Sequence, residues 1–266
     1  MGVYQPVNCA MNPPHFAVKA PTPFLVGGHI TLTGDEAHHM KDVLRLKIGD
    51  LANLINANGS KACARIINTG SDSVTLEILE NSAFQDDRLP IELIAAVIKG
   101  DKMSWLIQKA AELGVMAIRP VLTEHTVVRL DKEERKKKTG RWRDIALQTL
   151  KQCKGLAIPE IYQAVTLKEA IIAPDNEAGS KTRILLDEKY RGNGLIELWE
   201  GLKRPVAGII ILTGPEGGLS EDETDMCKNA GFLQASLGPR ILKAETAAIA
   251  AISILSALIL HDTTRQ

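Results

Sequence analysis

The sequence predicts an α/β protein with a small β-rich N-terminal domain, followed by a larger domain on a mostly parallel sheet. Residues 24–79 alternate short apolar strands with turns, residues 82–90 are polar and end in proline, and apolar strands then alternate with helical stretches. Apolar strands separated by helices are typical of a parallel sheet that is covered on both faces. We therefore expect an irregular arm over residues 1–23, a barrel over 24–85 and an α/β domain over 90–266.

The first domain is expected to form a small barrel. Three alternating apolar stretches supply its strands: residues 24–32, 50–68 and 73–79. Asn58-Gly59 marks a hairpin turn within the second stretch. Thr33 and Glu36 have the spacing of a capping box, so we expect a helix to begin at Thr33.

The second domain is expected to alternate strands with helices. Its apolar strand candidates are residues 91–98, 115–122, 183–188, 206–214 and 232–238. Its helix candidates are residues 101–113, 141–153, 194–202, 221–230 and 247–260. Gly114 is the expected C-terminal stop of the first helix. Ser220 and Glu223 form a capping box at the start of the fourth.

The last helix candidate, residues 247–260, is apolar around its whole circumference. A membrane-spanning helix needs about 20 apolar residues, so this one is too short to cross a bilayer. A helix without a polar face must be buried on all sides. Either the core of the domain or an interface with a second subunit would bury it.

Composition excludes several classes of protein. The formal net charge is +0, which excludes nucleic-acid binding through the whole surface but allows a local basic patch. The cysteines lie far apart, at Cys9, Cys63, Cys153 and Cys227, which predicts neither a disulfide framework nor a zinc site and fits the cytoplasm. Residues 1–18 lack a basic start followed by a long apolar run, so no secretion signal is expected. His38 and His39 lack acidic partners at zinc-site spacing, so no metal is expected.

Residues 214–223, GPEGGLSEDE, form a candidate ligand loop between an apolar strand and a helix. Open α/β sheets bind ligands beyond the carboxyl ends of their strands, and glycines leave the backbone accessible to a flat guest. The phosphate signatures G-x-x-x-x-G-K-[ST] and G-x-G-x-x-G are absent, and Glu216 would repel a pyrophosphate. The loop is therefore either a structural turn or a site for a guest with a positive centre and no phosphate.

Residues 236–246, SLGPRILKAET, form a second loop after a strand. Gly238-Pro239 forces a turn, and Thr246 is a candidate N-cap for the next helix. Ile241 and Leu242 either plug the core under the loop or form a wall for an aromatic ring such as adenine.

These two loops resemble those of the RsmE-type 16S ribosomal RNA uridine N3-methyltransferases of the SPOUT superfamily. The resemblance rests on LTGPEGGLSEDE and SLGPRILKAETAA, in this order and at this spacing. HHMKDVLRLKIGD near the N-terminus and KGDKMSWLIQKAAELGVMAIRPVLTE in the middle are also similar to family motifs. The resemblance therefore covers nearly the whole chain.

The resemblance implies a PUA-like barrel that holds RNA and a SPOUT α/β domain with a deep trefoil knot. It also implies S-adenosylmethionine as cofactor, a homodimer, and 16S rRNA of the small ribosomal subunit as substrate. Its cofactor-binding positions correspond to Leu186 (or its neighbour Leu185), Leu212, Gly214, Glu216, Gly217, Gly218, Leu237, Gly238, Ile241 and Leu242. Glu216 would lie near the sulfonium or would cap the helix after it.

Two positions depart from the pattern of this family. The family carries arginine three residues after Gln152, where this chain has Gly155, and arginine after Thr123-Glu124, where it has His125. Both positions are expected to face RNA.

Methylation of uridine N3 requires loss of its proton, so the site should stabilise a uridine anion. Arg240 is the expected catalytic cation facing the uracil oxygens, unless it forms a structural salt bridge with Glu245. Glu245 is expected to accept the proton or to orient Arg240, unless it only caps the helix.

The methylated edge of the base is the pairing edge, so the base must be unpaired and splayed out. Positive charge concentrates over residues 132–143, which also include Trp142. A solvated helix face explains such a run, whereas the resemblance favours phosphate contacts. The expected RNA-binding residues are Arg45, Lys47, Lys137, Lys138, Arg141, Arg143 and Lys154. Trp105 is expected in the core.

Other function classes compete with this one. A related SPOUT enzyme would act on transfer RNA or on a ribose 2′-hydroxyl group. A non-catalytic assembly factor would keep the fold and bind RNA without methyl transfer. A nucleotide-phosphate enzyme is disfavoured because the phosphate loops are missing.

Overall fold

The structure is a computed structural model, and it describes residues 13–18, 23–56, 60–82, 88–153, 157–172, 181–203 and 206–263. Contacts divide the chain into two compact units, Met1–Asp87 with Leu150–Ile158, and Arg88–Thr149 with Pro159–Gln266.

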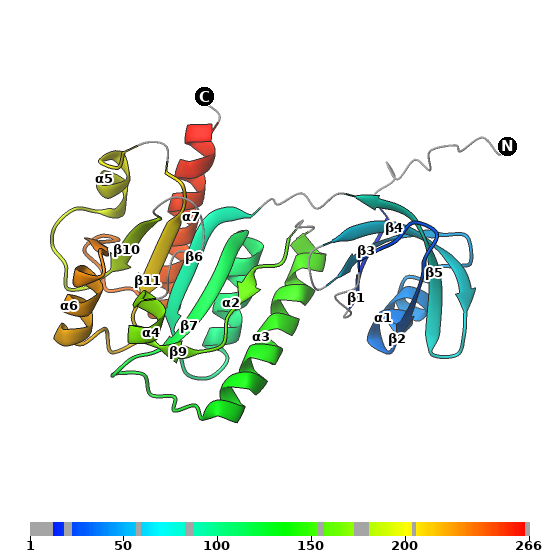
Figure 1. The fold of residues 1–266 in the computed structure, drawn as a ribbon, viewed down its shortest axis with the longest axis horizontal. Coiled ribbons are helices and arrows are strands. Elements are labelled where there is room, and N and C mark those ends of the chain that lie inside the picture. Colours follow the sequence, from blue (N-terminus) through cyan, green and yellow to red (C-terminus); the bar gives the residue numbers. More distant parts are fainter. Residues whose placement is uncertain are drawn as a thin grey trace. The chain divides into compact units, whose positions relative to one another are not determined.

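The N-terminal unit is a curled sheet of five strands in the order β1-β3-β4-β5-β2 (Figure 1). The strands are β1 (His15–Val18), β2 (His29–Thr33), β3 (Leu51–Asn56), β4 (Lys61–Thr69) and β5 (Ser73–Ser82). β1 pairs parallel with β3, and the other neighbours pair antiparallel. Phe16, Leu54 and Leu76 are fully buried in its core, as the alternation of apolar residues predicts.

The helix after β2 does not begin as predicted. α1 spans Asp35–His38, and its N-cap is Gly34, without a side-chain cap. Thr33 is instead the last residue of β2. The Glu36 carboxylate accepts a hydrogen bond from the backbone N–H of Ala17 at 3.2 Å. The prediction of a capping box from Thr33 and Glu36 is therefore wrong. Thr33 belongs to β2, and the Glu36 carboxylate is hydrogen-bonded to β1.

Cys63 on β4 is disulfide-bonded, which the wide spacing of the cysteines did not predict. Cys153 and Cys227 are free. Asn58-Gly59, the predicted turn, lies outside the described residues.

The C-terminal unit is built on a seven-stranded sheet in the order β12-β10-β11-β6-β7-β8, with β9 also paired to β7. Its strands are β6 (Leu89–Ala96), β7 (Val115–Leu122), β8 (Glu160–Ile161), β9 (Val165–Thr166), β10 (Thr182–Leu186), β11 (Ile209–Thr213) and β12 (Leu233–Ala235). Every pairing in this sheet is parallel. The predicted α/β class with a mostly parallel sheet is confirmed, and the trefoil knot stays a prediction.

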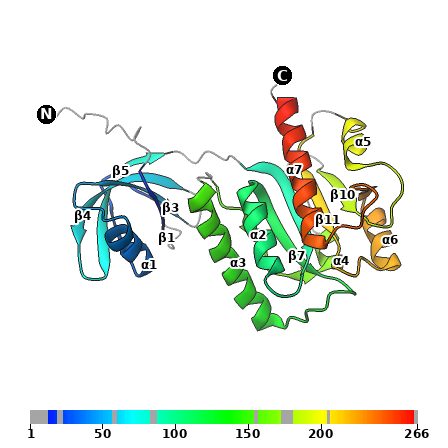
Figure 2. The ribbon, with the colours of Figure 1, turned by 180° about the vertical axis from the view of Figure 1, so that it is seen from behind.

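Helices cover both faces of this sheet. The helices that follow β6 in the chain are α2 (Lys102–Glu112), α3 (Lys132–Cys153), α4 (Leu167–Ile172), α5 (Leu195–Glu200), α6 (Glu221–Asn229) and α7 (Ala244–Thr263). Views from opposite sides show α4 and α6 on one face and α2 and α7 on the other (Figures 1 and 2). α4 has only 6 residues, which is too few for a periodic apolar pattern to reveal a helix.

α2 places one predicted core residue at the surface. Its buried side is formed by residues such as Met103, Leu106 and Ala110. Trp105 is 43% exposed, so its assignment to the core is wrong. Gly114 does end this helix as predicted, with a φ of 74° that favours glycine.

α7 is longer and less buried than predicted. It has 20 residues, so it is long and apolar enough to span a bilayer by length and composition, contrary to the expectation. Its buried residues include Ala248, Ile252 and Leu255, and the helix contacts β6, β11 and α2. Leu260 is 58% exposed. The chain thus buries one side of α7 and leaves the other open, and Thr246 lies inside the helix instead of capping it.

Candidate active site

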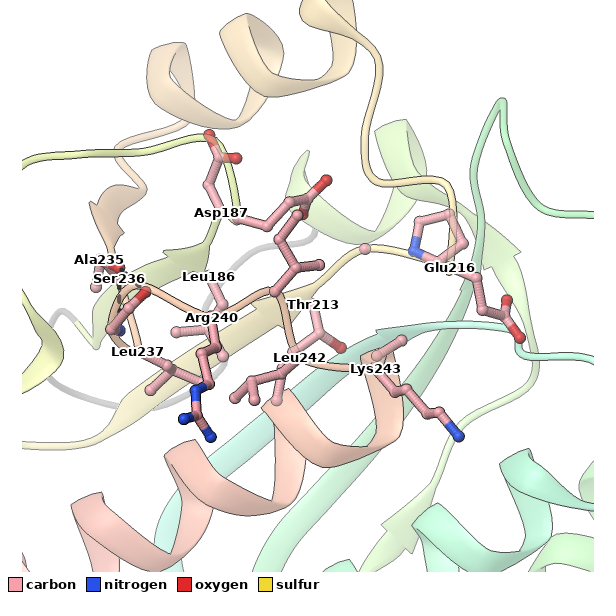
Figure 3. A pocket seen from close by; sticks show the side chains of 17 residues that line it. Leu186, Asp187, Thr213, Glu216, Ala235, Ser236, Leu237, Arg240, Leu242 and Lys243 are labelled. Carbon is pink, nitrogen blue, oxygen red and sulfur yellow. Dashed lines mark hydrogen bonds between the residues drawn. The ribbon is translucent and has the colours of Figure 1, made fainter.

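An open pocket of about 260 Å³ lies beyond the carboxyl ends of β10, β11 and β12 (Figure 3). These strands are parallel neighbours, so their carboxyl ends meet at one edge of the sheet. The loops that follow β10, β11 and β12 all contribute to the walls. The lining residues are Leu186, Asp187, Glu188, Thr213, Gly214, Pro215, Glu216, Ala235, Ser236, Leu237, Gly238, Arg240, Ile241, Leu242, Lys243, Ala244 and Ala247.

A buried carboxylate fixes the loop after β11. Ser220 and Glu223 form the predicted capping box, in which Ser220 Oγ accepts from the backbone N–H of Glu223 and Glu223 accepts from that of Ser220. The Glu223 carboxylate also accepts from the backbone N–H of Glu124 at 2.8 Å. It therefore joins the loop after β7 to the start of α6.

His125 makes a second link to the same loop. Its Nδ1 lies 3.0 Å from the carbonyl oxygen of Gly218. A side chain at Gly217 would bring a Cβ atom within 3.3 Å of the His125 Cβ. Gly217 therefore lets the two loops approach closely.

The backbone conformation of Gly218 favours glycine. Its φ of 70° is a conformation that residues with a side chain rarely adopt. A Cβ atom at this position would also displace the carboxylate of Glu188, an exposed side chain that lines the pocket. The glycines of this loop thus serve both backbone conformation and close packing.

The loop after β12 forms the opposite wall of the pocket. The backbone N–H of Gly238 donates to Ser236 Oγ at 3.2 Å, and the φ of Gly238 is 113°. Ile241 is 78% exposed and Leu242 is half-buried, and both line the pocket. Of the two roles considered for these residues, a pocket wall is the one that the structure shows.

Charged side chains lie on different sides of the pocket edge. Arg240 and Lys243 point in different directions, and Lys243 extends toward the side where Glu216 lies (Figure 3). Arg240 is exposed, and it has no ion-pair partner within the described part of the chain. The structural salt bridge considered between Arg240 and Glu245 is therefore not formed.

Glu216 pairs with a lysine from another element. Lys102 Nζ, at the start of α2, donates to Glu216 Oε1 at 3.0 Å. This hydrogen bond is the main cause that raises the pKa of Lys102, and the nearby charge of Glu245 adds a smaller contribution. Glu216 is therefore the hydrogen-bonded partner of Lys102, whereas Glu245 acts on Lys102 only through its charge.

The structure brings most of the predicted cofactor residues together. Those that line the pocket are Leu186, Gly214, Glu216, Leu237, Gly238, Ile241 and Leu242. Leu212, Gly217 and Gly218 do not border it; Leu212 is buried in β11 and the two glycines support the loop. The two predicted catalytic residues differ in position. Arg240 lines the pocket, whereas Glu245, in the first turn of α7, does not.

Sequence reasoning missed two acidic residues of the pocket. Asp187 and Glu188 follow β10 directly, and Asp187 accepts from Gln234 Nε2 at 2.7 Å. The signal was available, because polar residues after an apolar strand of a parallel sheet lie at its ligand-binding edge.

The predicted RNA-binding residues have different environments. Arg45 and Lys47 are exposed in the N-terminal unit, and Arg45 has a φ of 55°, which is unusual for a residue with a side chain. On α3, Lys137 and Arg141 are exposed and Lys138 is half-buried.

Two other residues of the basic run serve the fold. The guanidinium of Arg143 donates to the carbonyl oxygen of Ile161 at 2.9 and 3.2 Å, and Trp142 is buried. Lys154 and Gly155 lie outside the described residues.

The chain is similar to known RNA methyltransferases along most of its length. Residues 85–256 match the family described as an RNA methyltransferase domain, and residues 32–79 match an RNA methyltransferase PUA domain. Ribosomal RNA small subunit methyltransferase E of Bacillus subtilis is 30% identical over 231 residues, which cover 85% of this chain and 89% of that protein. The Synechocystis protein of the same name is 28% identical and covers 88% of this chain and 75% of its own length.

Solved structures agree with the sequence comparisons. A putative methyltransferase from Legionella pneumophila, in complex with the bound cofactor SAM, is 31% identical, has a TM-score of 0.78, and covers 92% of this chain and 98% of its own. Ribosomal RNA small subunit methyltransferase E from Neisseria gonorrhoeae, bound to S-adenosyl methionine, is 29% identical with the same TM-score and coverage. This chain therefore belongs to the RsmE-type RNA methyltransferase family of the SPOUT superfamily.

Proposed function

We propose that this protein transfers a methyl group from S-adenosylmethionine to N3 of a specific uridine in 16S ribosomal RNA of the small subunit. The observation that carries the proposal is the pocket formed by two glycine-containing loops at the carboxyl ends of parallel strands. Relatives of the same family have been solved with this cofactor bound.

The residues of the pocket fit a nucleoside that carries no phosphate. Leu237, Ile241 and Leu242 offer an apolar wall for the adenine and ribose. Glu188 and Glu216 at the edge would repel a phosphate group and would attract a positive centre. When bound, S-adenosylmethionine supplies the methyl group as an electrophile on a sulfonium.

The protein's own residues must prepare the uridine. N3 becomes nucleophilic when its proton leaves, and the negative charge then spreads to the neighbouring carbonyl oxygens. Arg240 lines the pocket with an exposed guanidinium, so it is the residue placed to donate to those oxygens. Glu245, the expected acceptor of the proton, does not line the pocket, so the proton is proposed to pass to solvent at the open side of the pocket.

We also propose that the protein works as a homodimer in the cytoplasm, with α7 at the interface. Ile249, Ile254 and Leu258 on α7 are only half-buried and Leu260 is exposed, and apolar side chains such as these are stabilised when a partner covers them. A second copy of the chain would bury this face beside the second loop of the pocket, since the N-terminal residues of α7 also line the pocket.

Nucleoside mass spectrometry tests the proposed reaction. Small-subunit RNA from cells that lack the gene should contain no 3-methyluridine at the target site, and purified protein with cofactor should restore it. Failure to restore it on intact small subunits would contradict the proposal. Methylation found on transfer RNA or on a ribose would instead identify a different SPOUT activity.

The role of Arg240 can be tested by substitution. Arg240→Ala should lower methyl transfer by roughly 100-fold or more, because it removes a charged donor to the uridine anion. Cofactor affinity, measured by calorimetry, should change little. Normal turnover in this variant would exclude the catalytic assignment.

A further inference from the structure

Two of the three carboxylates that line the pocket already have partners. Asp187 Oδ2 accepts a hydrogen bond from Gln234 Nε2 at 2.7 Å, and its Oδ1 accepts from the backbone N–H of Lys189 at 2.8 Å. Glu216 Oε1 accepts from Lys102 Nζ at 3.0 Å. Both carboxylates are therefore engaged by the protein itself.

Glu188 carries the third carboxylate, and it differs from the other two. Its side chain is exposed, and neither a hydrogen bond nor an ion pair engages its carboxylate among the residues that the structure describes. Its backbone is held, because its carbonyl oxygen accepts from Arg191 Nη1 at 2.6 Å. The charge of Glu188 therefore remains for a bound guest.

The Glu188 side chain reaches from the loop after β10 to the loop after β11. Its Oε1 atom lies so close to Gly218 that a Cβ atom there would displace it. The loop of Gly218 is in turn held by the Glu223 carboxylate, which accepts from the backbone N–H of Glu124 at 2.8 Å. Glycine at this position thus leaves room for a carboxylate at the wall of the pocket.

The charged groups of the pocket balance only while Glu188 is ionised. The lining holds three carboxylates and two cations, Arg240 and Lys243. Lys102, which is paired with Glu216, adds a third cation. Removal of the Glu188 charge would leave an excess of positive charge, which disfavours a cationic guest and has little effect on a neutral one.

The charge of the guest changes during the proposed reaction. The bond from sulfur to the methyl carbon breaks, and its electron pair stays on sulfur. The lone pair on N3, whose proton has left to solvent, forms the new bond to that carbon. The positive sulfonium of S-adenosylmethionine thereby becomes the uncharged thioether of S-adenosylhomocysteine. A carboxylate near the sulfur consequently favours the cofactor over its product.

We propose that Glu188 determines specificity for the sulfonium form of the cofactor over the thioether product, and that it thereby favours release of the product after transfer. This inference rests on the proposed function. The role requires an ionised carboxylate at the wall of the pocket and no contact with the uridine.

Glu188→Gln is the direct test, because it removes the charge and keeps the size of the side chain. Calorimetry on the full-length protein should compare S-adenosylmethionine, S-adenosylhomocysteine and methylthioadenosine, a thioether nucleoside without the amino-acid tail. We expect affinity for S-adenosylmethionine to fall about fivefold, as for the loss of an exposed ion pair, and the other two affinities to change by less than about twofold. Glu188→Asp keeps the charge and should retain most of the preference of the wild type.

Glu221→Gln is the matched control. Glu221 is an exposed carboxylate in the first turn of α6, and it does not line the pocket. The ratio of the affinities for S-adenosylmethionine and S-adenosylhomocysteine should therefore equal that of the wild type. Thermal unfolding of each variant shows that it is folded.

The outcomes separate this inference from the proposed function. A wild-type protein that binds neither S-adenosylmethionine nor S-adenosylhomocysteine would contradict the proposed function itself. A wild type that binds both, with an unchanged affinity ratio in Glu188→Gln, would overturn the role of Glu188 alone. Equal losses for these two ligands with normal binding of methylthioadenosine would also overturn it, since the carboxylate would then contact the ammonium group of the tail. A loss for all three ligands would indicate a damaged pocket and would overturn it as well.

Discussion

At the scale of single residues, His125 shows how a departure from the family's pattern is accommodated. The family resemblance led us to expect arginine there, facing RNA. In the structure, the imidazole lies against the loop after β11, with Nδ1 at 3.0 Å from the carbonyl oxygen of Gly218. His125 therefore supports the pocket from outside, whether or not it also contacts RNA.

His125→Ala should weaken cofactor binding without a comparable effect on the rate of transfer. Loss of one hydrogen bond costs about 1 kcal/mol, which corresponds to an affinity roughly fivefold lower. Calorimetric titration with S-adenosylmethionine checks this, with His29→Ala on β2 as the control. Unchanged affinity in His125→Ala would show that Glu223 alone holds the loop.

Tyr162 provides a prediction that depends on pH. Burial is the main cause that raises the pKa of Tyr162 to about 12, and its hydrogen bond to Glu160 at 2.9 Å adds to the rise. Because the pKa in the folded protein lies above the usual value of about 10, the stability that Tyr162 contributes is present below pH 10. It is lost as the pH rises toward about 12.

Absorbance titration at alkaline pH measures this residue directly. Tyr162→Phe should remove the ionisation step near pH 12 and leave earlier steps in place. It should also reduce the loss of stability between about pH 10 and 12. Tyr190→Phe is the control, and a late step that persists in Tyr162→Phe would contradict the assignment.

At the scale of elements, α7 combines two roles along one helix. Its first turn lines the pocket, and its buried side packs on the sheet. The sequence predicted burial around the full circumference, which the single chain does not provide. The half-buried and exposed apolar residues of α7 are what the proposed second subunit would cover.

A charge on that side should separate the subunits. Leu260 is 58% exposed. The substitution Leu260→Asp would place a carboxylate in the proposed interface. We expect the dimer to weaken by at least tenfold, about 1.4 kcal/mol. Analytical ultracentrifugation measures the change, and Ile172→Asp, at an exposed position on α4, is the control. A wild-type protein that sediments as a monomer would contradict the dimer.

At the scale of the whole molecule, the charge balance limits how RNA can be bound. The net charge is zero, so affinity must come from local groups such as the lysines of α3. Each phosphate contact adds to the dependence of binding on salt concentration, because bound counterions are released.

Substitution of two exposed lysines tests this surface. Lys136→Gln with Lys137→Gln should weaken RNA binding and lower the slope of log affinity against log salt by roughly 1 to 2. Filter binding at several salt concentrations measures the slope, with Lys228→Gln on α6 as the control. An unchanged slope would mean that these two lysines lie on a solvated helix face and do not contact RNA phosphates.

Local patterns determined much of this molecule in advance. Uniformly apolar strands predicted the parallel sheet, the spacing of Ser220 and Glu223 predicted the cap of α6, and Gly114 predicted the end of α2. These features depend on backbone hydrogen bonding and on conformational limits within a few residues, so sequence alone carries them. The resemblance of the two loops supplied the cofactor and the family.

Only the tertiary structure decided how distant groups meet. It joined Thr33 to a strand, exposed Trp105, and set Lys102 against Glu216, which lies 114 positions later in the chain. It also added Asp187 and Glu188 to the pocket and left one side of α7 open. Such contacts depend on which elements pack together and in what register, and neither is encoded in the local spacing of residues.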